Sequence, residues 1–171
     1  MMSLTRFALV CLLTLGALGQ SFAESNDDFA RDLYLGLPGP EMDLQFYGGG
    51  AGPIVGAHTK QKDDRNGGFC RATAAVYPGA PVEYACYGQL LTDADARDAY
   101  EGSTAGEMSV LFSINGNTLV GSAWLEKVVQ LPDFSIPLLC VKTHAVVPNP
   151  VPSYTCFKEL VPIGGGASIG N

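Results

Sequence analysis

The sequence predicts an α+β fold formed by tandem duplication of a small unit with about one helix, four antiparallel strands and one hairpin disulfide. Two observations predict it. The segments 70–90 and 140–160 are identical at eight of 21 aligned positions, where ordinary composition gives about one. The segments 30–34 and 96–100, Ala-Arg-Asp-Leu-Tyr and Ala-Arg-Asp-Ala-Tyr, match as well. Self-similarity that recurs along a chain indicates repeated structural units.

These matches divide the chain into four parts. Residues 1–23 contain one basic residue, an apolar run and a small-residue exit ending at Ala23, a pattern typical of a cleaved secretory signal peptide. Residues 24–92 and 93–161 are then the two repeat units, and the glycine-rich residues 162–171 are a flexible tail. We expect the units to share a sheet or a pseudo-two-fold core, or alternatively to close their eight strands into a sandwich with the helices at its ends.

Each unit is expected to begin with a short helix and to continue with strands. Apolar residues recur at helical spacing before Gly36 and before Gly102, and we expect each glycine to end its helix. In the second unit, strands over 108–114 and 118–124 flank Asn-Gly, the strongest short-range hairpin signal. The first unit has a glycine-rich turn over 47–53 in its place, so we expect the same hairpin with a looser loop.

The cysteines predict one disulfide within each unit. Cys11 leaves with the signal peptide, and the four that remain are Cys70, Cys86, Cys140 and Cys156. The first two and the last two have the same spacing, and a proline-rich turn lies midway between the members of each pair. This symmetry predicts hairpins closed by Cys70–Cys86 and Cys140–Cys156. An even number of cysteines in an exported chain fits a secreted or periplasmic protein.

Composition disfavours several partners. The formal net charge is −7, and binding to phosphate backbones requires clustered Lys and Arg. We therefore predict no nucleic-acid partner. Beyond the signal peptide, no apolar run approaches the 18 or more residues of a membrane helix, so we predict no membrane span.

The sequence offers little for catalysis, a cofactor or a metal. The glycine-rich segment 48–56 lacks the Lys-Ser/Thr ending of a phosphate-binding loop. His58 and His144 occupy non-equivalent positions in the two units, and neither belongs to a metal-binding spacing. We predict no cofactor, no metal site and no catalytic residue, and we favour a protein that is not an enzyme.

Two other classes of function stay open. A secreted hydrolase would use carboxylates that meet between the repeats, with Glu41 or Glu107 acting together with Asp32 or Asp98. A structural component of an envelope or extracellular matrix is the other alternative. The shared acidic and arginine residues are otherwise read as structural, because both copies of a duplicated unit retain them.

The units differ most in the apolar segment 124–139 of the second one. It contains Trp124, Leu131 and Phe134, residue types that can anchor an interface, and it either covers the core or forms an exposed binding patch. We therefore predict an exported, non-enzymatic binding protein whose partner is another protein or a small apolar ligand. Tandem disulfide-closed α/β units resemble, in architecture only, the secreted inhibitor proteins that block β-lactamases, which implies that such a scaffold can serve as a protein inhibitor.

Overall fold

The computed structural model describes residues 26–48, 56–145, 148 and 150–161. The predicted signal peptide 1–23 and tail 162–171 lie outside the described residues, as does most of the glycine-rich turn 47–53. The described helices and strands are, in chain order, α1 (Asn26–Gly36), β1 (Met42–Gly48), β2 (Ala57–Asp63), β3 (Phe69–Ala75), β4 (Val82–Thr92), α2 (Asp93–Gly102), β5 (Met108–Ile114), β6 (Asn117–Thr118), β7 (Ser122–Val129), β8 (Leu138–Ala145) and β9 (Ser153–Glu159).

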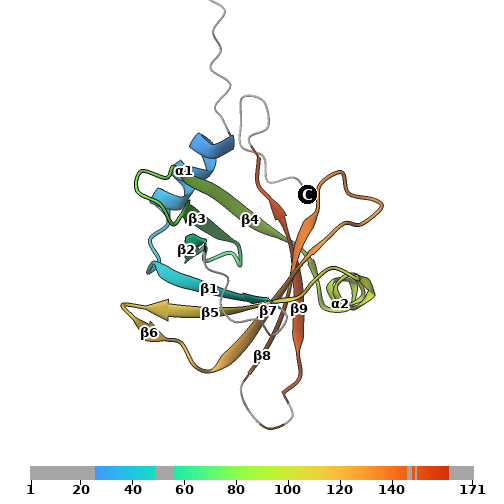
Figure 1. Cartoon of the computed structure of the whole chain (residues 1–171). Coiled ribbons are helices and arrows are strands. Elements are labelled where there is room, and N and C mark those ends of the chain that lie inside the picture. The colour runs from blue at the N-terminus through green and yellow to red at the C-terminus, as the bar shows by residue number, and fades with distance from the viewer. Residues whose placement is uncertain (1–25, 49–55, 146–147, 149, 162–171) are drawn as a thin grey trace, which may run out of the picture.

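The strands form one closed antiparallel barrel. Eight of them pair in the order β1-β2-β3-β4-β9-β8-β7-β5, and β5 pairs back with β1 to complete the ring, while the two-residue β6 extends from β5. In Figure 1 the ring surrounds a single interior, with α1 outside it at the upper left and α2 outside it on the right.

The predicted α+β fold of tandem helix-plus-sheet units is therefore wrong. Strands of the first half pair directly with strands of the second, β4 with β9 and β1 with β5. A four-stranded unit would leave the backbone N–H and C=O groups of its two edge strands unpaired, and closing both halves into one barrel removes all four such edges. Both helices lie outside the ring, so helix and sheet do not form separate units with their own cores.

The two predicted disulfides are confirmed. Cys70–Cys86 and Cys140–Cys156 each join neighbouring strands, with Cα–Cα distances of 4.0 and 3.9 Å. Both lie on the outer surface of the barrel under a helix. Cys86 and Cys156 approach the main-chain carbonyl oxygens of α1 and α2, and buried alanine and tyrosine side chains of each helix pack on the same cysteines. Each helix thus covers one cross-strand disulfide.

The predictions of helix ends and of the hairpin turn hold in part. The helices end at Gly36 and Gly102, as expected. Asn115 and Gly116 have φ values of 52° and 78°, the left-handed conformation that an Asn-Gly hairpin turn requires. The strand after this turn is shorter than predicted, because β6 ends at Thr118 and the chain resumes pairing with β5 only in β7.

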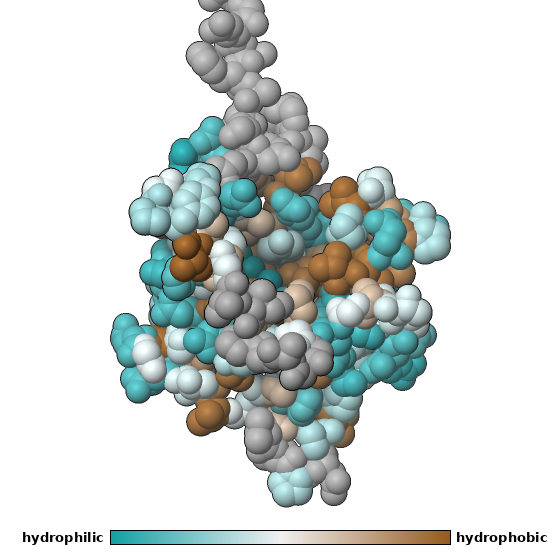
Figure 2. All heavy atoms as spheres, in the orientation of Figure 1, coloured by the Kyte–Doolittle hydropathy of each residue, from teal (hydrophilic) through white to brown (hydrophobic). Residues whose placement is uncertain are grey.

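Side chains alternate between the two faces of the barrel wall. In β3, Cys70 faces α1, whereas Phe69 and Arg71 face the interior, and the register places Phe69 beside Tyr87 of β4. On the face drawn in Figure 2, hydrophilic residues cover much of the surface, and hydrophobic residues gather in the right-hand half beside the β7–β8 connection. Within the described residues, no helix has the length and apolar character that crossing a bilayer requires.

Candidate binding site

A buried ion pair crosses the middle of the barrel. Arg71 of β3 donates from both terminal nitrogens to Glu126 of β7, with 3.1 Å between Nη1 and Oε2 and a second, shorter bond between Nη2 and Oε1. Arg71 is 8% exposed and Glu126 is fully buried. The fork-shaped contact satisfies both charges and joins strands from the two halves of the chain.

Further side chains complete this polar network. Arg71 Nε donates to Gln61 Oε1 at 2.9 Å, Gln61 Nε2 donates to Asp63 Oδ1 at 2.8 Å, and Trp124 Nε1 donates to Glu126 Oε1 at 2.6 Å. Among the described residues, no buried side-chain nitrogen or oxygen lacks a hydrogen-bond partner. The network therefore fills one part of the interior without leaving an unpaired polar group, and it fixes the orientation of the Trp124 indole.

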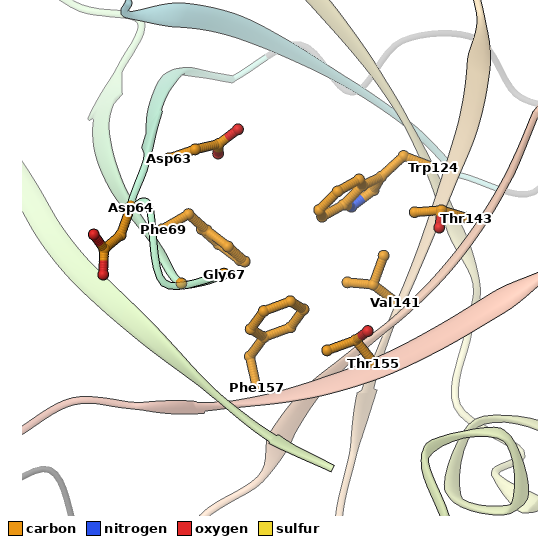
Figure 3. A pocket seen from close by; sticks show the side chains of 10 residues that line it. Asp63, Asp64, Gly67, Phe69, Trp124, Val141, Thr143, Thr155 and Phe157 are labelled. Atoms are coloured by element: carbon orange, nitrogen blue, oxygen red, sulfur yellow. The ribbon is translucent and has the colours of Figure 1, made fainter. Parts of the chain in front are cut away.

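Beside the network the interior is hollow. A cavity of about 260 Å³ lies between the β2–β3 turn and the inner faces of β7, β8 and β9. In Figure 3 the rings of Phe69, Trp124 and Phe157 point into this common space together with the Asp63 carboxylate, whereas the Asp64 carboxylate points away from it. Three aromatic rings and a valine form its apolar wall, and two carboxylates and two hydroxyl groups are its polar side chains; the lining residues are Asp63, Asp64, Gly67, Gly68, Phe69, Trp124, Val141, Thr143, Thr155 and Phe157.

The aromatic rings hold one another in place. Phe69 is in edge-to-face contact with Phe157 and with Trp124, with ring centroids 5.0 and 6.2 Å apart. Trp124 makes a further edge-to-face contact with Phe112 at 5.2 Å. Contacts of this geometry are favourable because the positive edge of one ring meets the negative face of another. These contacts therefore hold the apolar wall of the cavity in one arrangement.

Two glycines shape the rim of the cavity at the β2–β3 turn. Gly67 has a φ of 84°, which disfavours any side chain there. A Cβ atom on Gly68 would lie 2.6 Å from the main-chain oxygen of Tyr87, so this residue passes β4 too closely for a side chain. The turn that carries Asp63 and Asp64 is thus held tightly against the barrel wall.

The three predicted binding residues do not form one site. Trp124 lies in the cavity wall, inside the barrel. Leu131 and Phe134 follow β7 and pack from the connection to β8 onto the cluster under α2, on the outside of the barrel. Trp124 therefore lies on the opposite side of the barrel wall from Leu131 and Phe134, and the segment 124–139 is not one extended apolar patch.

This placement predicts a structural effect for Phe134→Ala. Phe134 is half-buried against the α2 cluster, so we expect the free energy of unfolding to fall by about 1 to 3 kcal/mol, less than for a fully buried phenylalanine. Urea unfolding measures it, with the exposed Ser135→Ala as the control. A change no larger than that of the control would show that Phe134 contributes no packing.

The glutamates predicted as hydrolase carboxylates, Glu41 and Glu107, each form their hydrogen bonds within their own half of the chain. Glu41 accepts hydrogen bonds from Tyr34 at 2.7 Å and from Lys60 at 2.6 Å, and these partners lower its pKa. Glu107 accepts the equivalent bond from Tyr100, also at 2.7 Å. The pKa of each tyrosine is raised mainly by burial and, to a smaller extent, by the carboxylate that accepts its hydrogen bond.

The acidic residues Asp32 and Asp98 pair on the exposed helix surfaces with the arginines that precede them, Arg31 and Arg97. No group of three or more His, Cys, Asp or Glu in the described part of the chain could hold a metal ion.

The sequence predictions missed most of the cavity wall. Phe69 and Phe157 each adjoin a disulfide cysteine, and so does Val141. Because neighbouring residues of a strand face opposite sides, cysteines that face a helix place these three side chains inside. That signal was present in the sequence, whereas nothing in the sequence indicated which strands meet across the barrel.

Comparisons with protein-family models, with curated proteins and with solved structures found no match. The fold and the site define the class of protein. It is an eight-stranded antiparallel barrel that is closed by strand pairing between its two halves, with a polar network and an aromatic cavity inside.

Proposed function

We propose that this protein is an exported, non-enzymatic binding protein that holds a small, largely apolar ligand in the cavity of its barrel. The observation that carries the proposal is the cavity of about 260 Å³ walled by Phe69, Trp124 and Phe157. Ligand sites are usually concave and mostly apolar, with a few polar groups that orient the ligand. Eight-stranded barrels have an interior wide enough to hold one small molecule.

The rigidity of the wall supports binding. The barrel has no free edge in its ring of eight strands, and the Arg71–Glu126 contact ties β3 to β7 across it. A cavity that is formed in advance loses little conformational freedom when a ligand enters, so more of the contact energy appears as affinity.

The two disulfides are compatible with an extracellular or periplasmic location, because such bonds persist in oxidising compartments. Together with the predicted signal peptide 1–23, they support our proposal of export.

A protein partner is the second candidate from the sequence, but the exposed large apolar residues belong to different elements, among them Leu35 of α1, Leu111 of β5 and Val151 before β9. The cavity favours the small ligand.

Trp124 provides the test, because it is the one tryptophan in the sequence and lines the cavity. We expect its fluorescence to shift or to be quenched in a saturable way by at least one of six small probes: choline, 3,3-dimethylbutan-1-ol, 3,3-dimethylbutanoate, benzylammonium, benzyl alcohol and benzoate. The probes cover cationic, neutral and anionic molecules, so the test does not depend on ligand charge.

A cavity-filling variant makes the test specific. Thr155→Phe places a ring in the cavity and should lower the affinity for the probe that binds by about tenfold or more. A tenfold change corresponds to a loss of about 1.4 kcal/mol in the free energy of binding. Thr118→Phe, on the exposed β6, is the matched control and should bind like the wild type. The proposal fails if no probe gives a saturable response, or if both variants respond equally.

A further inference from the structure

We infer that the ligand is an organic cation, a quaternary or protonated ammonium group on a small apolar body. This inference rests on the proposed function and adds the charge class of the ligand. Its basis is the combination of aromatic walls, two rim carboxylates and a neutralised interior around one cavity, with no Lys, Arg or His among the ten lining residues.

The aromatic wall favours a cation over a neutral molecule. Phe69, Trp124 and Phe157 come from three different strands, and Figure 3 shows their side chains around the same space. The face of an aromatic ring carries negative potential and attracts a cation within about 6 Å, most strongly for tryptophan. Cages of such rings recognise quaternary ammonium groups, whose methyl surface also gains from an apolar wall.

The rim adds a net negative charge. Asp63 and Asp64 line the cavity, and neither forms an ion pair with a basic side chain of the described residues. Asp63 accepts one hydrogen bond from the neutral Gln61. Arg65 lies in the same turn but is exposed and does not line the cavity. In Figure 3 the Asp63 carboxylate points toward the aromatic rings, whereas that of Asp64 lies at the rim and points away from them. A cation in the cavity therefore meets the Asp63 carboxylate directly and the charge of Asp64 from the rim, and an anion meets repulsion.

The interior arginine does not reverse this preference. The guanidinium of Arg71 lies 4.9 Å from the centre of the Phe69 ring, close to the cavity wall. Both of its terminal nitrogens donate to Glu126, and its Nε donates to Gln61. Its positive charge is thus matched by a buried carboxylate, three of its five N–H groups donate to Glu126 and Gln61, and it is not among the residues that line the cavity.

Three probes of nearly identical shape test the charge directly. Choline carries a trimethylammonium head, and 3,3-dimethylbutan-1-ol and 3,3-dimethylbutanoate carry a tert-butyl head of nearly the same shape, so the three differ mainly in charge. Their affinities for the chain of residues 24–171 are measured by Trp124 fluorescence and by calorimetry. We expect choline to bind about tenfold more tightly than the neutral alcohol, and the anion to bind most weakly. The preference for choline should shrink as salt is added.

A double variant assigns the preference to the rim. Asp63→Asn with Asp64→Asn keeps the acceptor for Gln61 and removes both charges, so the affinity for choline should fall at least about threefold while that for the alcohol stays the same. Asp95→Asn with Asp133→Asn changes the net charge equally at exposed positions outside the cavity and is the control. An unchanged thermal midpoint verifies that each variant folds.

The outcomes separate this inference from the proposed function. Tighter binding of the alcohol or the anion than of choline would overturn the cation inference and leave the cavity as a ligand site. An equal loss of choline affinity in both double variants would also overturn it, because the effect would then come from net charge. A saturable response to none of the probes would overturn the proposed function itself.

Discussion

Glu126→Ala is expected to lower the free energy of unfolding by about 3 to 5 kcal/mol, the usual loss when one partner of a buried ion pair is removed. Arg71 would keep its charge at 8% exposure with no carboxylate beside it. Trp124 would also lose the acceptor of its indole N–H. Chemical denaturation of the purified variant measures the loss, and altered Trp124 emission should accompany it.

Two controls identify the cause. Arg71→Met with Glu126→Leu removes both charges and retains most of the volume, so it should recover most of the lost stability, because apolar replacements of a buried ion pair are often neutral or stabilising. Glu101→Ala breaks the exposed contact with Lys142 and should cost far less. If the double variant were as unstable as Glu126→Ala, the loss would come from packing around the site rather than from the uncompensated charge.

The second large effect concerns half of the chain. A fragment of residues 24–92 is expected to show no cooperative unfolding transition and to self-associate, even with its disulfide formed. It would retain β1 to β4 but expose the edges of β1 and β4, which pair with β5 and β9 in the intact barrel. Arg71 would lose Glu126, and Phe69 would lose its contacts with Trp124 and Phe157. Unpaired edges and exposed apolar surface favour association.

Gel filtration and circular dichroism with increasing temperature test this expectation, with the chain of residues 24–171 as the reference. Mapping of the unreduced fragment should verify the Cys70–Cys86 bond, so that a missing disulfide does not explain the result. A monomeric fragment with a sharp thermal transition would contradict the expectation and would show that the first half owns a complete core.

Trp124 contributes both to the proposed function and to the stability of the barrel. Its indole N–H is held by Glu126, and its ring forms part of the cavity wall. Variants of the polar network should therefore change the proposed ligand binding through the position of this ring. Variants of the residues packed around the two disulfides under α1 and α2 should change stability with less effect on that proposed binding. This difference follows from the alternation of side chains across one sheet.

Local features were predictable from the sequence because their causes are local. The Asn115-Gly116 turn follows from the backbone freedom of those two residues, and the helices end at Gly36 and Gly102. The disulfide partners follow from equal spacing about a central turn, which places the cysteines of each hairpin opposite each other. Each of these features involves residues close together in the chain.

What only the tertiary structure decided is how the two halves meet. The repeat predicted equivalent halves but did not show that β1 would pair with β5 and β4 with β9, since antiparallel edges can pair in several ways. The Arg71–Glu126 contact joins residues 55 positions apart, and the cavity depends on rings from three strands. By itself, therefore, the sequence determined the turns, the disulfides and the helix ends through short-range geometry. Barrel closure, the buried charge pair and the aromatic cavity depend on contacts between strands far apart in the chain, and the pairing of unlinked strand edges together with the burial of their shared face decides these contacts.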